Sequence, residues 1–156
     1  MRSRSLRRDS RRATTTVEVA FMLPVFLLFL FGSVQFGHAV LVDTVLKSAC
    51  REAARYGSTE GVTTAEVIAK AQGIISSTVD INAVTLMVKD AAYYDENTHP
   101  NGYDELPDVE VADAEVGDMI LVRATVNYRN VALIALPLLD FVEDIPLVGQ
   151  SFTRHE

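Results

Sequence analysis

The densest group of side chains capable of chemistry in this sequence is a cluster of carboxylates in the loop 93–118. Nine acids fall there: Asp95, Glu96, Asp104, Glu105, Asp108, Glu110, Asp113, Glu115 and Asp118. Carboxylate oxygens on a loop are ligands that Ca²⁺ takes, in sets of about six to eight. Because the acids do not follow the spacing of a calcium-binding loop, we favour a solvated acidic loop and keep calcium binding as the alternative.

No arrangement of residues in the sequence predicts catalysis. The three histidines, His38, His99 and His155, lie far apart and lack the spacing of metal ligands. No serine lies in a G-x-S-x-G turn, and there is no glycine-rich phosphate loop. The sequence therefore predicts a protein that is not an enzyme, with no cofactor and no catalytic or metal site.

The single cysteine, Cys50, excludes a disulfide framework within the chain. It lies on a stripe of small and apolar residues at helical spacing, formed by Val45, Leu46, Ala49, Ala53, Ala54 and Gly57. A small packing residue is therefore the preferred interpretation of Cys50. An intermolecular disulfide is the alternative, because we expect this segment to lie outside the cytoplasm.

The stripe continues from an uncharged stretch that organises the whole chain. From Val19 to Val42, 24 residues include no Lys, Arg, Asp or Glu, and about 20 apolar residues suffice for a helix to span a bilayer. We predict one long helix over residues 14–57, with its transmembrane span at 19–42. A signal peptide cleaved at Ala39 is the alternative, but it requires a shorter apolar run.

The charge of the chain is divided unevenly about this stretch. Residues 1–12 carry six Arg and one Asp, whereas the remaining residues carry eight basic and twenty acidic side chains. Basic flanks of a span stay on the cytoplasmic side, so we expect residues 1–13 to form a cytoplasmic head or leader that contacts lipid headgroups. A short basic tail on an acidic body does not suit nucleic-acid binding.

Residues 58–156 read as an extracytoplasmic α+β domain. Thr63 and Glu66 form a capping box before an apolar helical face, which predicts a helix near residues 64–77. Alternating residues predict antiparallel strands, with Val84, Leu86 and Val88 in one and with Ile120, Val122, Ala124, Val126 and Tyr128 in the next.

Three further segments complete the expectation for this domain. Val109 and Val111 are expected to add a short edge strand, and residues 147–153 a last one. The apolar segment 131–142 is too short to span a bilayer, so it covers the sheet, lies on the membrane or binds a partner. The predicted fold is thus a long N-terminal transmembrane helix, a small helix and a sheet of three or four antiparallel strands.

Two stretches of the chain resemble the TadE-like family of pseudopilins, from the tight-adherence pilus systems of bacteria. Residues 11–24, RRATTTVEVAFMLP, resemble the family's opening of basic and small residues, Val-Glu and Leu-Pro. Residues 48–57, SACREAARYG, are similar to its Ala-Ala-Arg-Glu-Gly-Ala-Arg-Tyr segment, and the final strand with its charged ending adds a weaker likeness. The resemblance implies a pilin-like fold and a role in assembling a tight-adherence, type IV-like pilus rather than catalysis.

The resemblance also implies how the chain is processed and what it contacts. A prepilin peptidase would cleave between Ala13 and Thr14, which makes Glu18 the fifth mature residue; Ala13 stands where the family usually has glycine. Glu18 would then either pair helices during assembly, through the new α-amino group of Thr14, or cap the helix N-terminus through the helix dipole. The implied partners are membrane lipid, other pilins or pseudopilins and the assembly machinery, at the bacterial inner membrane.

Three classes of function are therefore compared. The first is a membrane-anchored minor pilin or pseudopilin, which the Val17-Glu18 placement and the small-residue stripe favour. The second is a generic membrane-anchored extracytoplasmic binding module that uses the acidic loop. The third is a secreted enzyme released at Ala39. The mature N-terminus separates all three.

Overall fold

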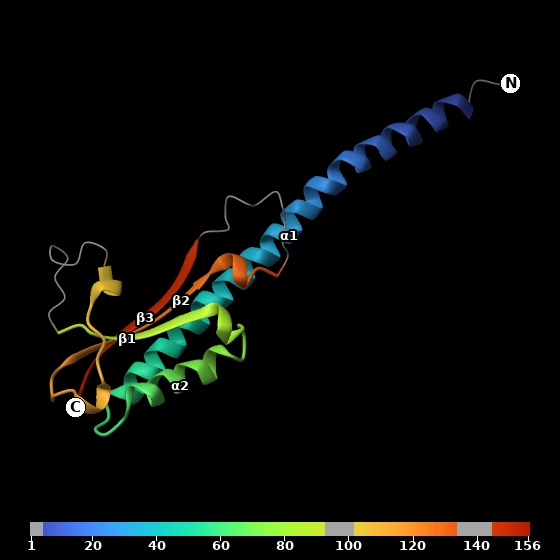
Figure 1. Cartoon of the computed structure of the whole chain (residues 1–156). Coiled ribbons are helices and arrows are strands. Elements are labelled where there is room, and N and C mark those ends of the chain that lie inside the picture. Colours follow the sequence, from blue (N-terminus) through green and yellow to red (C-terminus); the bar gives the residue numbers. More distant parts are fainter. Residues whose placement is uncertain (1–4, 93–101, 134–144) are drawn as a thin grey trace. The chain divides into compact units, whose positions relative to one another are not determined.

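The computed structural model describes the backbone of residues 5–92, 102–133 and 145–156, and the side chains of these residues from Thr16 onward. The chain divides into two compact units, Met1–Gly37 and His38–Glu156. The elements follow the order helix, helix, strand, strand, strand, with short 3₁₀ turns between them (Figure 1). The predicted α+β fold with a long N-terminal helix is confirmed.

Helix α1 runs from Ser5 to Gly57 without interruption, with Pro24 inside it. It begins nine residues before the predicted start, so residues 5–13 of the predicted head are helical as well. Arginine is a good helix former, and a helix already nucleated adds each further residue at little cost. The expected continuation of the helix through Ala39 and beyond the apolar stretch is correct.

The second unit is built on a three-stranded antiparallel sheet in the order β1-β2-β3 (Figure 1). Its strands are β1 (Val84–Asp90), β2 (Met119–Asn127) and β3 (Pro146–Arg154). The central strand buries Ile120, Val122, Ala124 and Val126 on one face, as the alternation predicts. Tyr128 falls just after β2, in a 3₁₀ turn, so the strand begins and ends one residue earlier than expected.

Helix α2 (Thr64–Ile75) and the part of α1 after His38 lie on this buried face of the sheet. The capping box is formed as expected, because Thr63 Oγ1 accepts from the Glu66 amide while the Thr63 amide donates to Glu66 Oε2 at 2.9 Å. The apolar face of α2, with Val67 and Ala71 fully buried, completes the core.

Residues 109–111 do not form the expected edge strand. Val111 begins a 3₁₀ turn and is fully buried, and the only strand-like pairing near it is an isolated bridge between Asp108 and Lys89. A buried valine has the same hydrophobicity in a turn as in a strand, so two alternating valines cannot distinguish them. The apolar segment 131–142 lies largely outside the described residues.

Candidate functional site: an exposed apolar helix and its glutamate

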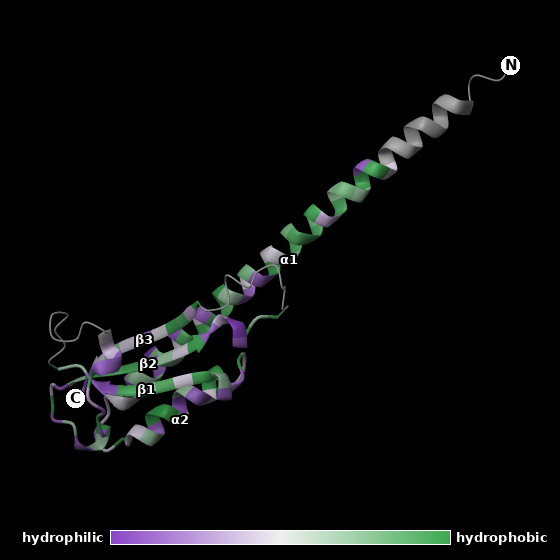
Figure 2. Ribbon diagram, turned by 45° about the horizontal axis from the view of Figure 1, so that its top comes forward, coloured by the Kyte–Doolittle hydropathy of each residue, from purple (hydrophilic) through white to green (hydrophobic). Residues whose placement is uncertain are grey.

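The first unit presents large apolar side chains that are exposed in the part of the chain that the structure describes. Large side chains from Val17 to Phe36 are exposed, including Phe21 (75%), Phe29 (74%) and Phe36 (73%). Figure 2 shows the hydrophobic colour along this part of α1. Soluble monomers rarely expose such a continuous apolar patch. Among the described residues, one helix is long and apolar enough to cross a membrane, with a mean hydropathy of 2.3 over its most apolar window.

The predicted processing and pairing residues all lie on α1. The Ala13–Thr14 peptide bond is inside the helix, so a peptidase would first have to unwind it locally. Glu18 is exposed and follows this bond by four residues. Since α1 begins at Ser5 and has no acid in its first turn, Glu18 is not a helix cap in the uncleaved chain. Cleavage after Ala13 would bring it near a new N-terminus.

The stripe of small residues further along α1 is used inside the protein. Ala49, Cys50, Ala53 and Ala54 are buried in the core of the second unit. Opposite them, Gly149 of β3 lies against the α1 backbone, where an added Cβ would meet the Leu46 carbonyl carbon and lie 2.6 Å from its oxygen. The stripe therefore seats α1 on the sheet of the same chain.

Cys50 is held in the same contact. Its side chain is fully buried, and Sγ donates to the Gly149 carbonyl oxygen at 3.2 Å. Desolvation by burial raises the pKa of the Cys50 thiol to about 11, against a smaller lowering by a hydrogen bond with the Ala124 backbone. Because the thiolate is the reactive form, this environment supports the packing role rather than an intermolecular disulfide.

The carboxylates of the acidic loop that the structure describes contact separate partners. Asp104 lies 3.6 Å from Arg123 and Asp108 lies 2.8 Å from Lys89. Glu110 accepts from the Thr64 amide, which ties the segment to the start of α2. Among the residues described, no three His, Cys, Asp or Glu side chains are placed to hold a metal ion. Asp95 and Glu96 lie outside those residues.

The two described histidines, His38 and His155, lie in different surroundings. His38 Nδ1 is buried without a hydrogen-bond partner among the described residues, whereas Nδ1 of the buried His155 lies 3.3 Å from the Gly57 carbonyl oxygen. His99 lies outside the described residues. The two described histidines therefore form no common site.

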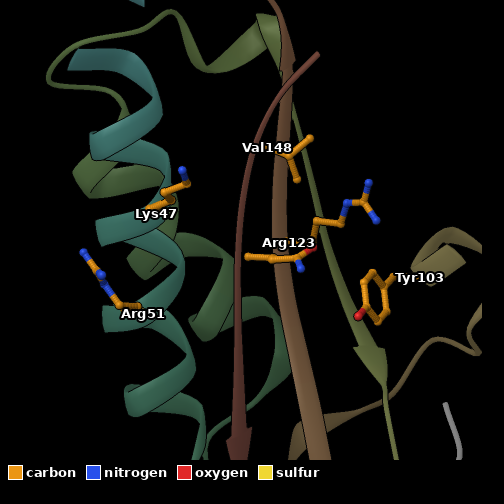
Figure 3. A pocket seen from close by; sticks show the side chains of 6 residues that line it. Lys47, Arg51, Tyr103, Arg123 and Val148 are labelled. Atoms are coloured by element: carbon orange, nitrogen blue, oxygen red, sulfur yellow. The ribbon is translucent and has the colours of Figure 1, made fainter. Parts of the chain in front are cut away.

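The sequence analysis missed one surface feature, an open groove of about 510 Å³ in the second unit (Figure 3). It is lined by two basic residues of α1, by side chains of the sheet and by a 3₁₀ turn: Lys47, Arg51, Tyr103, Arg123, Val148 and Gln150. The four-residue spacing of Lys47 and Arg51 marks one face of the helix. Nothing in the sequence shows that this face borders β3, because that depends on the packing at Gly149.

Comparison with known proteins extends these observations. Residues 13–55 match the family model described as TadE-like protein, which confirms the resemblance over that segment. The match covers the predicted processing residues, Ala13 and Thr14, the apolar stretch and most of the small-residue stripe. It supports a general association with tight-adherence pilus assembly, a family with no known enzymes. No curated protein and no solved structure matches the chain.

Proposed function

Because residues 13–55 match the TadE-like family, we propose that this protein is a membrane-anchored minor pilin or pseudopilin that takes part in assembling a tight-adherence pilus. One observation carries the proposal: the matched segment is also the helix segment whose apolar side chains are exposed. A surface of this kind must be covered by lipid or by neighbouring apolar helices, and a pilin meets both environments. The protein acts as an assembly component without enzymatic activity.

The proposed location is the bacterial inner membrane, with residues 1–13 in the cytoplasm and residues 58–156 outside. The arginines of the head favour this orientation because basic flanks resist translocation. A prepilin peptidase would release the head at Ala13–Thr14, which allows the processed subunit to leave the membrane and enter a filament.

The pairing role of Glu18 follows from its position after that cleavage. The new α-amino group of Thr14 would be a cation near neutral pH, with a reference pKa of about 7.7–8.0. A carboxylate close to the membrane interior is stabilised by such a partner, on the same subunit or on a neighbour. Pairing between subunits would set the register of the helices.

The test uses a strain lacking the gene and the same strain carrying the full chain. We expect loss of tight-adherence pili in the deletion strain and their recovery on complementation, counted by electron microscopy. Mass spectrometry of the membrane and sheared-filament fractions should find a chain beginning at Thr14. Normal piliation of the deletion strain would contradict the proposed function, and a chain beginning at Val40 would indicate secretion instead.

A generic membrane-anchored binding module is the second candidate function. The basic groove of the second unit favours it, because a groove of this size is unnecessary for packing α1 on the sheet. An intact filament in the deletion strain, together with retention of the full chain in the membrane of the complemented strain, would favour this second function.

A further inference from the structure

In the part of the chain that the structure describes, no strand lies beside the outer edge of β3. The ladder between β2 and β3 continues at its ends through the Tyr128 amide to the Ile145 oxygen (3.0 Å) and the His155 amide to the Asp118 oxygen (2.9 Å). In an antiparallel ladder, alternate residues direct both backbone groups to the same neighbour. The odd-numbered residues of β3 therefore bond to β2, and Val148, Gln150 and Phe152 direct theirs to the open edge.

No backbone hydrogen bond to these three residues is present within the described part of the chain. The opposite edge of the sheet differs. There the Val84 amide bonds to the Ile81 oxygen at one end of β1, and the Asp90 amide bonds to the Pro107 oxygen at the other. The edge of β3 is thus the better site for a further strand.

The basic groove lies at this edge. Val148 and Gln150 line it together with Lys47 and Arg51 from α1, and Tyr103 and Arg123 line it from the outer face of the sheet (Figure 3). A strand placed along the edge would send alternate side chains toward α1 and toward that outer face. Lys47 and Arg51 are the basic residues on the α1 side, and Arg123 is the basic residue on the outer face.

The charges of the groove are only partly neutralised. Lys47 bonds to Asp43 at 2.7 Å, and Arg123 lies 3.6 Å from Asp104 while its Nε is buried without a partner in the described residues. Arg51 has no ion pair within the described part of the chain. Basic side chains beside an edge strand discourage pairing with neutral or basic strands, but they attract an acidic one.

We propose that the open edge of β3 binds an extended acidic peptide segment of a partner protein as a fourth strand of the sheet. Backbone hydrogen bonds to Val148, Gln150 and Phe152 supply the pairing, and Arg51 and Arg123 select carboxylates. This interaction is separate from the proposed role of α1 and does not depend on pilus assembly.

The experiment uses the full chain in detergent micelles and a fluorescein-labelled peptide, Thr-Glu-Glu-Val-Glu-Glu-Thr, which has glutamates on both faces of an extended strand. One control peptide replaces every glutamate by glutamine. The other N-methylates every backbone amide, so that neither edge of the peptide can donate to a neighbouring strand. Fluorescence anisotropy should show binding of the acidic peptide and at least about tenfold weaker binding of each control. Hydrogen exchange should show protection of the Val148, Gln150 and Phe152 amides only when the acidic peptide is present.

Two variants separate the charge from the backbone pairing. Arg51→Glu should weaken binding of the acidic peptide at least about tenfold, whereas Arg55→Glu, an exposed arginine one turn along α1 and outside the groove, should leave it unchanged. Gln150→Pro removes an amide that faces the open edge, so the ladder to β2 remains and peptide binding is lost. Circular dichroism checks that each variant is folded.

Several results would overturn the proposal. The first is that the acidic peptide does not bind at millimolar concentration. The second is that the N-methylated peptide binds as tightly as the acidic peptide. The third is that the acidic peptide binds without protecting the three edge amides from exchange. Protection of these amides in the absence of peptide, rising with protein concentration, would assign the edge to self-association instead. The exchange measurement on the unmodified chain decides the question even if Gln150→Pro fails to fold.

Discussion

At the scale of single residues, Gly149 sets the distance between α1 and the sheet. A Cβ at this position would lie 2.6 Å from the Leu46 carbonyl oxygen and 2.7 Å from the Lys47 amide nitrogen. Both are backbone atoms, which cannot rotate away as a side chain can. The close approach also allows Cys50 to reach the Gly149 carbonyl, so one glycine accounts for the position of the helix and of the thiol.

We therefore expect Gly149→Ala to lower the free energy of unfolding by about 1–3 kcal/mol or more, because α1 must shift away from β3. This change in the free energy of unfolding is measured by guanidinium unfolding of the full chain, in which circular dichroism follows the transition of the second unit. The matched control is Gly73→Ala in α2, where an added Cβ meets nothing within 4 Å. That change should stabilise the protein by about 0.5–1 kcal/mol. Equal effects of the two changes would contradict the close-packing argument.

The buried thiol gives a second residue-scale prediction. With the pKa of Cys50 raised to about 11 by burial, iodoacetamide at pH 8 should modify the folded protein very slowly and the unfolded protein rapidly. Mass spectrometry measures the modified fraction with time. The same experiment on non-reduced membranes should find Cys50 as a free thiol; a disulfide-linked dimer on a non-reducing gel would show that the packing interpretation is wrong.

Glu18 gives the third prediction at the scale of single residues. Glu18→Gln removes the charge and keeps the size, so we expect unchanged membrane insertion and impaired assembly of pili if the carboxylate pairs with the Thr14 amine of a subunit. Membrane fractionation and filament counts measure the two effects separately. Glu60→Gln, an exposed glutamate in the turn after α1, is the control and should change neither. Normal assembly of Glu18→Gln with the same mature N-terminus leaves the pairing role without support.

At the scale of elements, the start of α2 depends on its capping box. Thr63→Ala removes the side chain that accepts from the Glu66 amide and donates to Glu66 Oε2 at 3.0 Å. A lost N-cap costs about 0.5–2 kcal/mol of stability, which denaturant unfolding measures. Thr59→Ala, in the exposed turn before α2, is the control and should have little effect.

The contribution of the Thr63–Glu66 capping box to stability also depends on pH. Hydrogen bonds from the backbone and then the side chain of Thr63 lower the pKa of Glu66 below its ordinary value of 4.5. When folding lowers the pKa of a carboxyl group, the ionised group stabilises the fold at pH values above its unfolded-state pKa. This stabilisation is lost as the pH falls through the folded-state pKa. The difference between Thr63→Ala and the unmodified chain should therefore shrink below about pH 4.5. A difference that grows with acid would contradict this account.

The elements themselves were largely predictable from the sequence. The apolar run, the capping box and the alternation in β1, β2 and β3 are local patterns, and each predicted the correct type of element. Residues 109–111 were assigned wrongly because a buried valine fits a turn as well as a strand. The groove at β3 could not be predicted, since it arises where Arg51 and Gln150, far apart in the chain, are brought together by the contact at Gly149.

At the scale of the whole molecule, the division of charge matters more than its total. The head carries six arginines and one aspartate, while the rest of the chain has twelve more acids than bases. Retention of basic residues on the cytoplasmic side fixes the orientation of a single span, and acids contribute little to that choice. The acidic surface also makes the basic groove beside β3 a local exception, which sharpens its selectivity for carboxylates.

The orientation is testable with a reporter placed after Glu156. Alkaline phosphatase, which folds only outside the cytoplasm, should be active there, and a cytoplasmic reporter at the same position should be inactive. The cause is the basic head, so replacing Arg7, Arg8, Arg11 and Arg12 by serine should reduce phosphatase activity as part of the population inserts in reverse. Replacing Arg51 and Arg55, which lie beyond the apolar stretch, should not reduce it. An active cytoplasmic reporter after Glu156 in the unmodified chain would mean that the second unit lies inside the cell. Neither a pilin nor an extracytoplasmic binding module would then remain.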